Sequence, residues 1–346
     1  MIRTFVCGRL EAREYMFETG GVIPMASNHK NRFKPPSILE FQERFATEED
    51  CIRFLFAKRW PNGWTCPRCG SAKSYPIKGR RVFECANCRY QVSVTAGTVL
   101  QKTRTPLRVW FLAIFFMVTD KRGISSVGLA RLLGVSQKKA WFMLHKLRKA
   151  MAVRNGRYKL DGFVELDESF FGAPKEGGGR GRGTAKKKVL AGLSLTKDGK
   201  PRHLRLRVLP RINRANLMPA LEEMITPGTT VKTDGLRSYL GLTEKGYHHE
   251  RVIATETEVL VELRWIHVAI SNAKALIGGT YHGLGAAEGK HLQAYLEEYT
   301  YRYNRRQRLD TIFDRMVVAV VSCPVWTYQD ITGKKRSDKK AKREAA

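Results

Sequence analysis

Four of the seven cysteines stand in two closely spaced pairs, Cys66 with Cys69 and Cys85 with Cys88. Fifteen residues separate the pairs, and each pair has the Cys-x-x-Cys spacing of a tight knuckle. Two such knuckles bring four thiolates into one tetrahedron, the closed coordination typical of structural Zn²⁺. We therefore predict a zinc ribbon that stabilises the fold and takes no part in catalysis.

Two aspartates interrupt or end apolar strand patterns in the second half of the chain. Asp167 lies within the pattern Val-Glu-Leu-Asp-Glu-Ser-Phe at 164–170, and Asp234 ends the pattern Val-Lys-Thr-Asp at 231–234. A carboxylate on a buried strand is costly unless it is paired or bound to a cation. On neighbouring strands the two could hold Mg²⁺ or Mn²⁺ for phosphoryl transfer. The alternative is that Asp167 pairs with a basic neighbour and Asp234 caps a turn before Gly235.

A helix-turn-helix pattern precedes these strands. Residues 124–133 indicate a first helix, Gly-Val-Ser at 134–136 a turn, and residues 137–151 a second helix with an inward apolar stripe. Basic residues are expected on the outer face of the second helix, where a recognition helix contacts DNA. The alternative is an ordinary helical pair with a solvated basic face. The DNA contacts expected from this face are Lys138, Lys139 and Lys146, beside His145, Arg148 and Lys149.

The elements that would position these residues change in type along the chain. Residues 38–60 and 106–151 have helical periodicity, and Thr47 followed by Glu48 and Glu49 predicts a capped helix start. Strands are expected at 163–167, 189–195, 203–209 and 229–234. Helices are expected at 213–225, 256–278 and 290–306. The pattern predicts an α/β domain that follows a ribbon and a helical region.

The composition favours a nucleic-acid partner. Lys and Arg number 62 against 32 Asp and Glu, which gives a net charge of +30, and 43% of the residues are hydrophobic. Such a chain can bury a core, and its positive charge suits phosphates. The longest apolar run, 109–118, is too short to cross a membrane, and the first twenty residues have no signal-peptide core. We expect a cytoplasmic, nucleoid-associated protein.

Several segments, in this order, resemble zinc-ribbon insertion-sequence transposases of the DDE class. They are FQERFATEEDCIRFLFAKRWPNGWTCPRCG, FVELDESFFG, TTVKTDGLRSY, WIHVAISNAKALIGGTYHG and KHLQAYLEEYTYRYNRR, within residues 38–326. The resemblance implies an RNase H-like mixed-sheet fold and metal-dependent cleavage and strand transfer at transposon ends. It also implies that Asp167 and Asp234 are the metal ligands, and that double-stranded DNA at the ends and target is bound by a homo-oligomer.

The expected organisation is an extension at 1–37, a helical lead-in at 38–60 and a ribbon at 61–98. A helix-turn-helix region at 106–152, a catalytic domain at 158–326 and a basic tail at 327–346 follow. The Gly-rich loop 174–188 and the stretch 301–306, with Arg305 and Arg306, are candidate DNA-backbone contacts or solvated basic surface.

The third metal ligand departs from a plain Asp-Asp-Glu pattern, because no Glu stands at the usual helix position. Asn272 beside Lys274 resembles the version that some members of the group carry. Helical spacing instead places His267 and Lys274 on one edge of an apolar stripe and Asn272 on the other side. Both candidates stay open, with Lys274 expected near the scissile phosphate. The missing Glu also allows a DNA-binding regulator with a decayed catalytic domain, or a nuclease that cuts without joining. Rival carboxylates are Glu258, Glu262 and Glu288.

Overall fold

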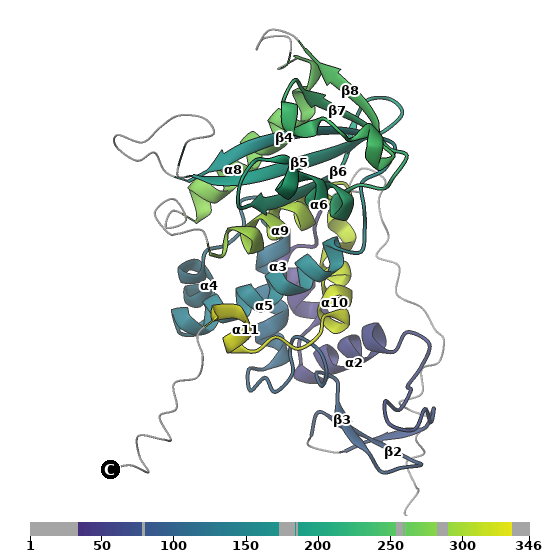
Figure 1. The fold of residues 1–346 in the computed structure, drawn as a ribbon. Helices are drawn as coiled ribbons and strands as arrows, with labels where there is room; N and C mark the ends of the chain where they lie inside the picture. Colours follow the sequence, from purple (N-terminus) through teal and green to yellow (C-terminus); the bar gives the residue numbers. More distant parts are fainter. Residues whose placement is uncertain are drawn as a thin grey trace, which may run out of the picture.

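A computed structural model of the chain describes residues 34–77, 80–172, 184, 186–253, 259, 261–281 and 290–333. Most of the predicted extension, most of the Gly-rich loop and most of the basic tail lie outside these residues, as do Glu258 and Glu288. The described chain has three regions: a ribbon, a group of helices and a twisted sheet, arranged from bottom to top in Figure 1. Among the described residues, no helix has the length and apolar character needed to cross a membrane.

The ribbon is a three-stranded antiparallel sheet of β1 (Ser74–Pro76), β2 (Val82–Cys85) and β3 (Gln91–Ser93). Aromatic rings join it to the preceding helix α2 (Glu48–Arg59): the centroids of Phe56 and Phe83 are 4.8 Å apart. The helix starts at a capping box formed by Thr47 and Asp50, which confirms the capped start that the sequence predicts at Thr47.

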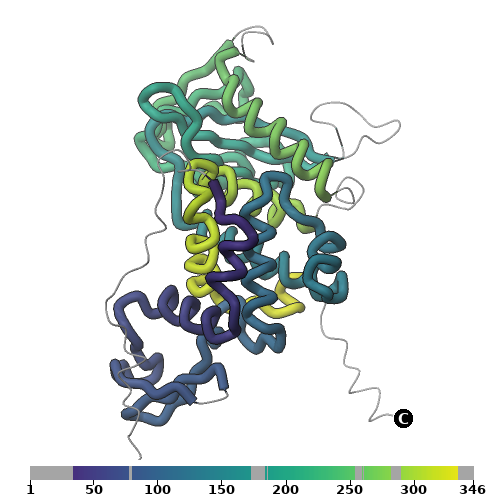
Figure 2. Tube along the Cα trace, turned by 180° about the vertical axis from the view of Figure 1, so that it is seen from behind, coloured from purple at the N-terminus to yellow at the C-terminus, as the bar shows by residue number. Residues whose placement is uncertain are grey.

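The helical region has one hydrophobic core, formed by α1 (Ile38–Arg44), α2, α3 (Leu107–Thr119), α4 (Ser126–Leu133), α5 (Gln137–Asn155) and α10 (Ile312–Ser322). Helix α10 lies near the end of the predicted catalytic range, yet Figure 2 shows it beside the purple N-terminal helix. Asp314 of α10 binds Arg44 and Lys58, each at 3.1 Å. The end of the predicted catalytic range therefore packs in the helical core, because the apolar side of α10 is covered there.

Helix α5 is surrounded by other helices, namely α3, α4, α9 (Leu292–Tyr303), α10 and α11 (Tyr328–Thr332). Helix α11 forms within the segment predicted as a basic tail. The predicted outer face of α5 is wrong over its central turns, since His145, Lys146 and Arg148 are 2%, 6% and 1% exposed. Helical spacing gives the faces of a helix but does not show that neighbours cover more than one of them.

The sheet has five strands in the order β6-β5-β4-β7-β8. Strands β4 (Phe163–Phe171), β5 (Lys187–Leu195) and β6 (Pro201–Leu209) are antiparallel neighbours. Strands β7 (Thr230–Asp234) and β8 (His248–Val252) run parallel to β4. Helix α6 (Arg214–Met224) covers one face, and α8 (Arg264–Thr280) and α9 cover the other. This mixed sheet between helices is the RNase H-like arrangement that the family resemblance implies.

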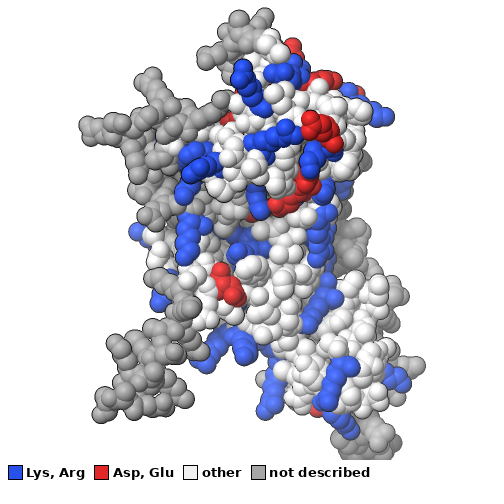
Figure 3. Space-filling model, in the orientation of Figure 1, with Lys and Arg blue, Asp and Glu red and all other residues white. Residues whose placement is uncertain are grey.

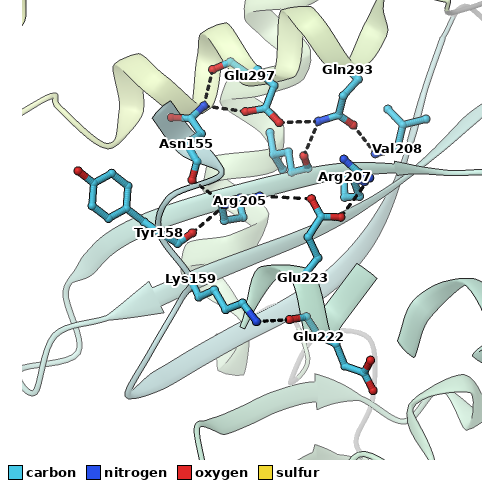
Figure 4. A network of polar contacts seen from close by, with 11 residues as sticks. Asn155, Tyr158, Lys159, Arg205, Arg207, Val208, Glu222, Glu223, Gln293 and Glu297 are labelled. Atoms are coloured by element: carbon cyan, nitrogen blue, oxygen red, sulfur yellow. Dashed lines mark hydrogen bonds and ion pairs between the residues drawn. The ribbon is translucent and has the colours of Figure 1, made fainter. Parts of the chain in front are cut away.

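A buried polar network ties the helical region to the sheet. Asn155, at the end of α5, donates to the Glu297 carboxylate on α9 at 2.7 Å. Arg205 of β6 donates to the carbonyl oxygens of Asn155 and Tyr158 at 2.7 and 2.8 Å, and Gln293 joins Glu297 to the β6 backbone (Figure 4). These contacts fix the exit of α5 against the sheet edge.

Candidate active site

The four ribbon cysteines converge as predicted. The sulfur atoms of Cys66 and Cys88 are 3.7 Å apart, those of Cys69 and Cys85 are 3.6 Å apart, and all four lie within 4.8 Å of one another. Four sulfurs around Zn²⁺ at bonds of about 2.3 Å would be about 3.8 Å apart. The backbone N–H of Cys88 lowers the pKa of Cys85 to about 6, whereas burial and the neighbouring cysteine side chains raise the pKa of Cys88. The ribbon fits a closed structural zinc site.

The two predicted aspartates lie on adjacent parallel strands. Glu165 of β4 is paired with Lys232 of β7, and Asp167 and Asp234 each follow this last pair by two residues. Alternate strand residues share a face, and this face lies under α8, because Val164 and Val231 point into the core on the α6 side. Both carboxylates therefore lie on the α8 side of two adjacent strands, at their carboxyl ends.

A buried tyrosine marks the same group of carboxylates from the other side. Tyr239 lies in the short 3-10 helix η4 (Arg237–Tyr239) that follows Asp234, and its side chain is fully buried. Burial raises the pKa of Tyr239, and the charges of Glu168, Asp167 and Asp234 raise it further. Residue type and spacing alone do not mark Tyr239 as part of this site, although it follows Asp234 by only five residues.

Helix α8 brings one of the two candidate third ligands to this group. The Nε2 atom of His267 lies 3.3 Å from the Oδ2 atom of Asp167, and the two side chains are 24% and 18% exposed. Asn272 is exposed on a different side of α8 and lines a cavity that faces α4 and α5. The structure therefore brings His267, and not Asn272, next to Asp167. The rival Glu262 is half exposed and forms an ion pair with Lys232.

A further carboxylate, which its place in the sequence does not mark as functional, holds the start of α8. The N-cap residue of α8, Leu263, provides no side-chain cap. Glu165, 3% exposed on β4, accepts a hydrogen bond from the Ile266 N–H at 2.7 Å instead. The N-terminal end of a helix attracts negative charge, although burial raises the pKa of this carboxyl. Because Glu165 and Asp167 share a strand face, this cap fixes the position of His267 along β4.

Lys274 lies at the edge of the same site. Its ammonium is 5.8 Å from the centroid of the Phe171 ring at the end of β4, and it is close enough to feel the charges of Asp167 and Lys186. Burial lowers the pKa of Lys274, and Asp167 opposes that shift. The predicted pairing of His267 and Lys274 on one edge of α8 matches this arrangement.

The predicted DNA-contacting lysines of α5 differ in their exposure to solvent. Lys138 and Lys139 are exposed at the start of α5, after the left-handed Gly134 that ends α4 and the Ser136 cap. Lys146 instead donates to the Val99 carbonyl oxygen at 2.7 Å and is buried, so its predicted surface position is wrong.

Arg305 and Arg306 are half-buried. Their guanidinium groups donate hydrogen bonds to backbone carbonyl oxygens of the protein. Arg305 donates to the Tyr301 carbonyl oxygen at 2.9 Å, and its guanidinium lies 3.6 Å from the centroid of the Tyr301 ring. Arg306 donates to the carbonyl oxygens of Pro201, Arg202 and Tyr303. Arg306 therefore braces the end of α9 against the start of β6, whereas Arg305 folds back onto α9.

The donor set of the aspartate site fits Mg²⁺ or Mn²⁺, which prefer hard oxygen ligands. Adjacent ligands of an ion bound at about 2.1 Å are about 3 Å apart, close to the 3.3 Å between Asp167 and His267. Among the described residues, only the cysteine cluster gathers three or more potential ligand atoms within 4.8 Å. The ligand atoms of Asp167, Asp234 and His267 therefore do not all lie within 4.8 Å of one another.

Known family models match the ribbon region and the sheet region of the chain. A transposase zinc-ribbon domain matches residues 46–91, and an ISXO2-like transposase domain of the DDE type matches residues 159–304. An uncharacterized protein in transposable element ISH50 of Halobacterium salinarum is 28% identical, over 58% of this chain and 71% of that protein.

Two solved structures are also similar to the chain. One is a pre-cleavage Mos1 transpososome, with 15% identity, a TM-score of 0.24 and coverage of 59% of this chain and 75% of that chain. The other is a Mos1 strand transfer complex, with 14% identity, a TM-score of 0.23 and coverage of 66% of this chain and 82% of that chain. TM-scores of this size carry no argument about the fold, which rests on the sheet order and the family models. The chain therefore carries a transposase zinc-ribbon domain followed by an ISXO2-like transposase domain of the DDE type, the two parts of a zinc-ribbon insertion-sequence transposase.

Proposed function

We propose that this protein binds the ends of its element as double-stranded DNA, acting as a homo-oligomer, and catalyses metal-dependent strand cleavage and strand transfer. The observation that carries the proposal is the position of Asp167 and Asp234 on adjacent parallel strands, with His267 3.3 Å from Asp167. The charge of the surface supports a DNA partner: Figure 3 shows Lys and Arg over the whole height of one face and few Asp or Glu.

In this proposal Asp167, Asp234 and His267 hold Mg²⁺ or Mn²⁺. Such cations, when bound, activate a water or a 3′-hydroxyl and stabilise the leaving oxygen of the phosphodiester. Lys274, at the edge of the site, binds a phosphate oxygen beside the scissile bond. Glu165 keeps α8 at a fixed height above β4, so the imidazole and the carboxylate keep their spacing during the reaction.

The test is a cleavage and strand-transfer assay on DNA that carries the element's ends, with Mg²⁺ or Mn²⁺ supplied. Asp167→Ala and Asp234→Ala should lower cleavage by orders of magnitude, while DNA binding persists or tightens because negative charge is removed near the DNA. Asp198→Ala, in the exposed turn between β5 and β6, removes the same charge away from the site and is the matched control. Near-normal cleavage by either site variant would refute the proposal. Retained binding with no cleavage by the unaltered protein would favour the regulator.

The third ligand is tested at saturating DNA, so that binding does not limit the rate. His267→Ala should slow the cleavage step more than Asn272→Ala does, and His267→Glu should keep or raise Mg²⁺-supported cleavage because a carboxylate is the harder ligand. Normal cleavage by His267→Ala would remove His267 from the site.

A further inference from the structure

A cavity of about 1190 Å³ separates the helix pair α4 and α5 from α8. Trp141 and Arg148 of α5 line one wall, and Asn272 and Gly279 of α8 line the other. Asn272 follows His267 by five residues, which is a rotation of about 140° around a helix of 3.6 residues per turn. This α5–α8 groove is therefore separated from the aspartate site only by the width of α8.

The walls of the groove combine aromatic rings with neutral and cationic polar groups. Trp141 is half-buried, and its ring centroid lies 4.1 Å from that of His145 and 5.4 Å from that of His291. Neutral polar side chains, including the exposed amide of Asn272, face the same space. Lys121 and Arg122 are the cationic residues at the rim, and the lining that the structure describes includes no Asp or Glu. This chemistry suits a flat, hydrogen-bonding group attached to a negative charge.

A nucleotide has these properties when its base leaves the duplex stack. Unstacked bases bind against aromatic side chains, and every base offers a π-face for that contact. An amide such as that of Asn272 can both donate to and accept from a base edge. Lys121 can neutralise the attached phosphate, whereas Arg122 is paired with Asp120 at 3.1 Å. The groove also lies between the exposed start of α5, with its basic residues, and the helix that carries His267.

We propose that the α5–α8 groove binds one unstacked nucleotide of the DNA end, with its base against Trp141 and the base edge toward Asn272. This inference rests on the proposed function, because it takes the DNA end as the ligand. It also gives a role to Asn272, which the structure places away from Asp167.

The test measures binding of end DNA by fluorescence anisotropy with full-length protein that carries Asp167→Asn, so that cleavage does not enter. Trp141→Ala should weaken binding about 5- to 150-fold, the value of one base–aromatic stack. The measurement is repeated with DNAs that each lack one base near the cleavage position. One of these DNAs lacks the base that enters the groove. The protein with Trp141 and the Trp141→Ala variant should bind this DNA equally, because it has no base to stack on the ring.

Three further variants make the outcome decisive. Trp141→Phe retains a ring and should keep most of the affinity. Asn272→Ala changes an exposed position that cannot disturb the core. This variant should lose affinity for intact DNA but not for the DNA that lacks the base bound in the groove. It therefore tests the inference even if Trp141→Ala fails to fold. Tyr158→Ala removes a 52% exposed ring outside the groove and should not change binding.

The inference is overturned if Trp141→Ala binds intact DNA normally, as it would if another protein segment occupied the groove. It is also overturned if the loss is the same for every DNA that lacks a base. Failure of the proposed function would appear separately, as cleavage that does not depend on Asp167 or Asp234.

Discussion

Removing the guanidinium of Arg148 should destabilise the protein more than any surface substitution. Arg148 on α5 and Glu298 on α9 form an ion pair of 2.8 Å between Nε and Oε2, and the two side chains are 1% and 0% exposed. The Tyr281 hydroxyl donates to the other carboxylate oxygen at 2.9 Å, and the Arg148 guanidinium lies 4.2 Å from the centroid of the Tyr295 ring. The pair joins the helical region to the helix that braces the sheet.

The expected magnitude follows from the burial of both partners. In Arg148→Met the Glu298 carboxylate stays buried and loses its bond from Arg148. Among the described contacts, the Tyr281 hydroxyl is then the one side-chain donor that remains to this carboxylate. Breaking a buried pair in this way costs about 3–5 kcal/mol, a large part of the 5–15 kcal/mol that holds a typical domain folded. Replacing both partners removes the uncompensated charge, so Arg148→Met with Glu298→Leu should recover most of that loss.

The assay is urea unfolding of the full chain followed by circular dichroism, for both single variants and the double variant. The exposed pair Arg214 and Glu244, with side chains 55% and 71% exposed, is the control, and Glu244→Gln should change the free energy of unfolding by less than about 1 kcal/mol. The reasoning fails if Arg148→Met also stays within that limit, or if the double variant is no more stable than the single ones.

Three more predictions concern the ribbon, the α8 cap and acid stability. The protein should contain about one zinc per chain, and Cys66→Ser with Cys85→Ser should lose it and unfold the ribbon alone; a full zinc content measured in that double variant would contradict the site. Glu165→Ala should speed hydrogen exchange of the Ile266 amide about 2- to 30-fold, the value of a helix cap, whereas Glu165→Gln keeps an acceptor and should not; equal rates in both variants would argue against the cap. Burial lowers the pKa of His145 to about 2, so below about pH 6.5 the unfolded state takes up a proton that the folded state refuses. Relative to His145→Phe, the unaltered protein should therefore lose about 2 kcal/mol of unfolding free energy between pH 7 and pH 5, and parallel pH curves would show that this histidine is not the cause.

Features that depend on neighbours in the chain could be predicted from the residues alone. The two Cys-x-x-Cys knuckles, the cap at Thr47, the turn at Gly134 and the start of α6 after Asn213 lie where the sequence predicts them. Each is formed by side chains and backbone groups within about one helical turn, so its geometry follows from residue type and spacing. The strand positions of Asp167 and Asp234 follow in the same way from the period of two.

Contacts between distant parts of the chain could not be predicted in this way. Spacing places His267 and Asn272 on different sides of α8 but does not show which side meets Asp167; the cap from Glu165, more than one hundred residues earlier, decides that. Lys146 has the composition of a surface residue, yet packing against α5 on several sides buries it. A periodic pattern describes one helix at a time, whereas its orientation depends on which faces of other elements it buries. For that reason the local sequence determines which type of site each segment can form, whereas tertiary packing determines which of the candidate residues lie in that site.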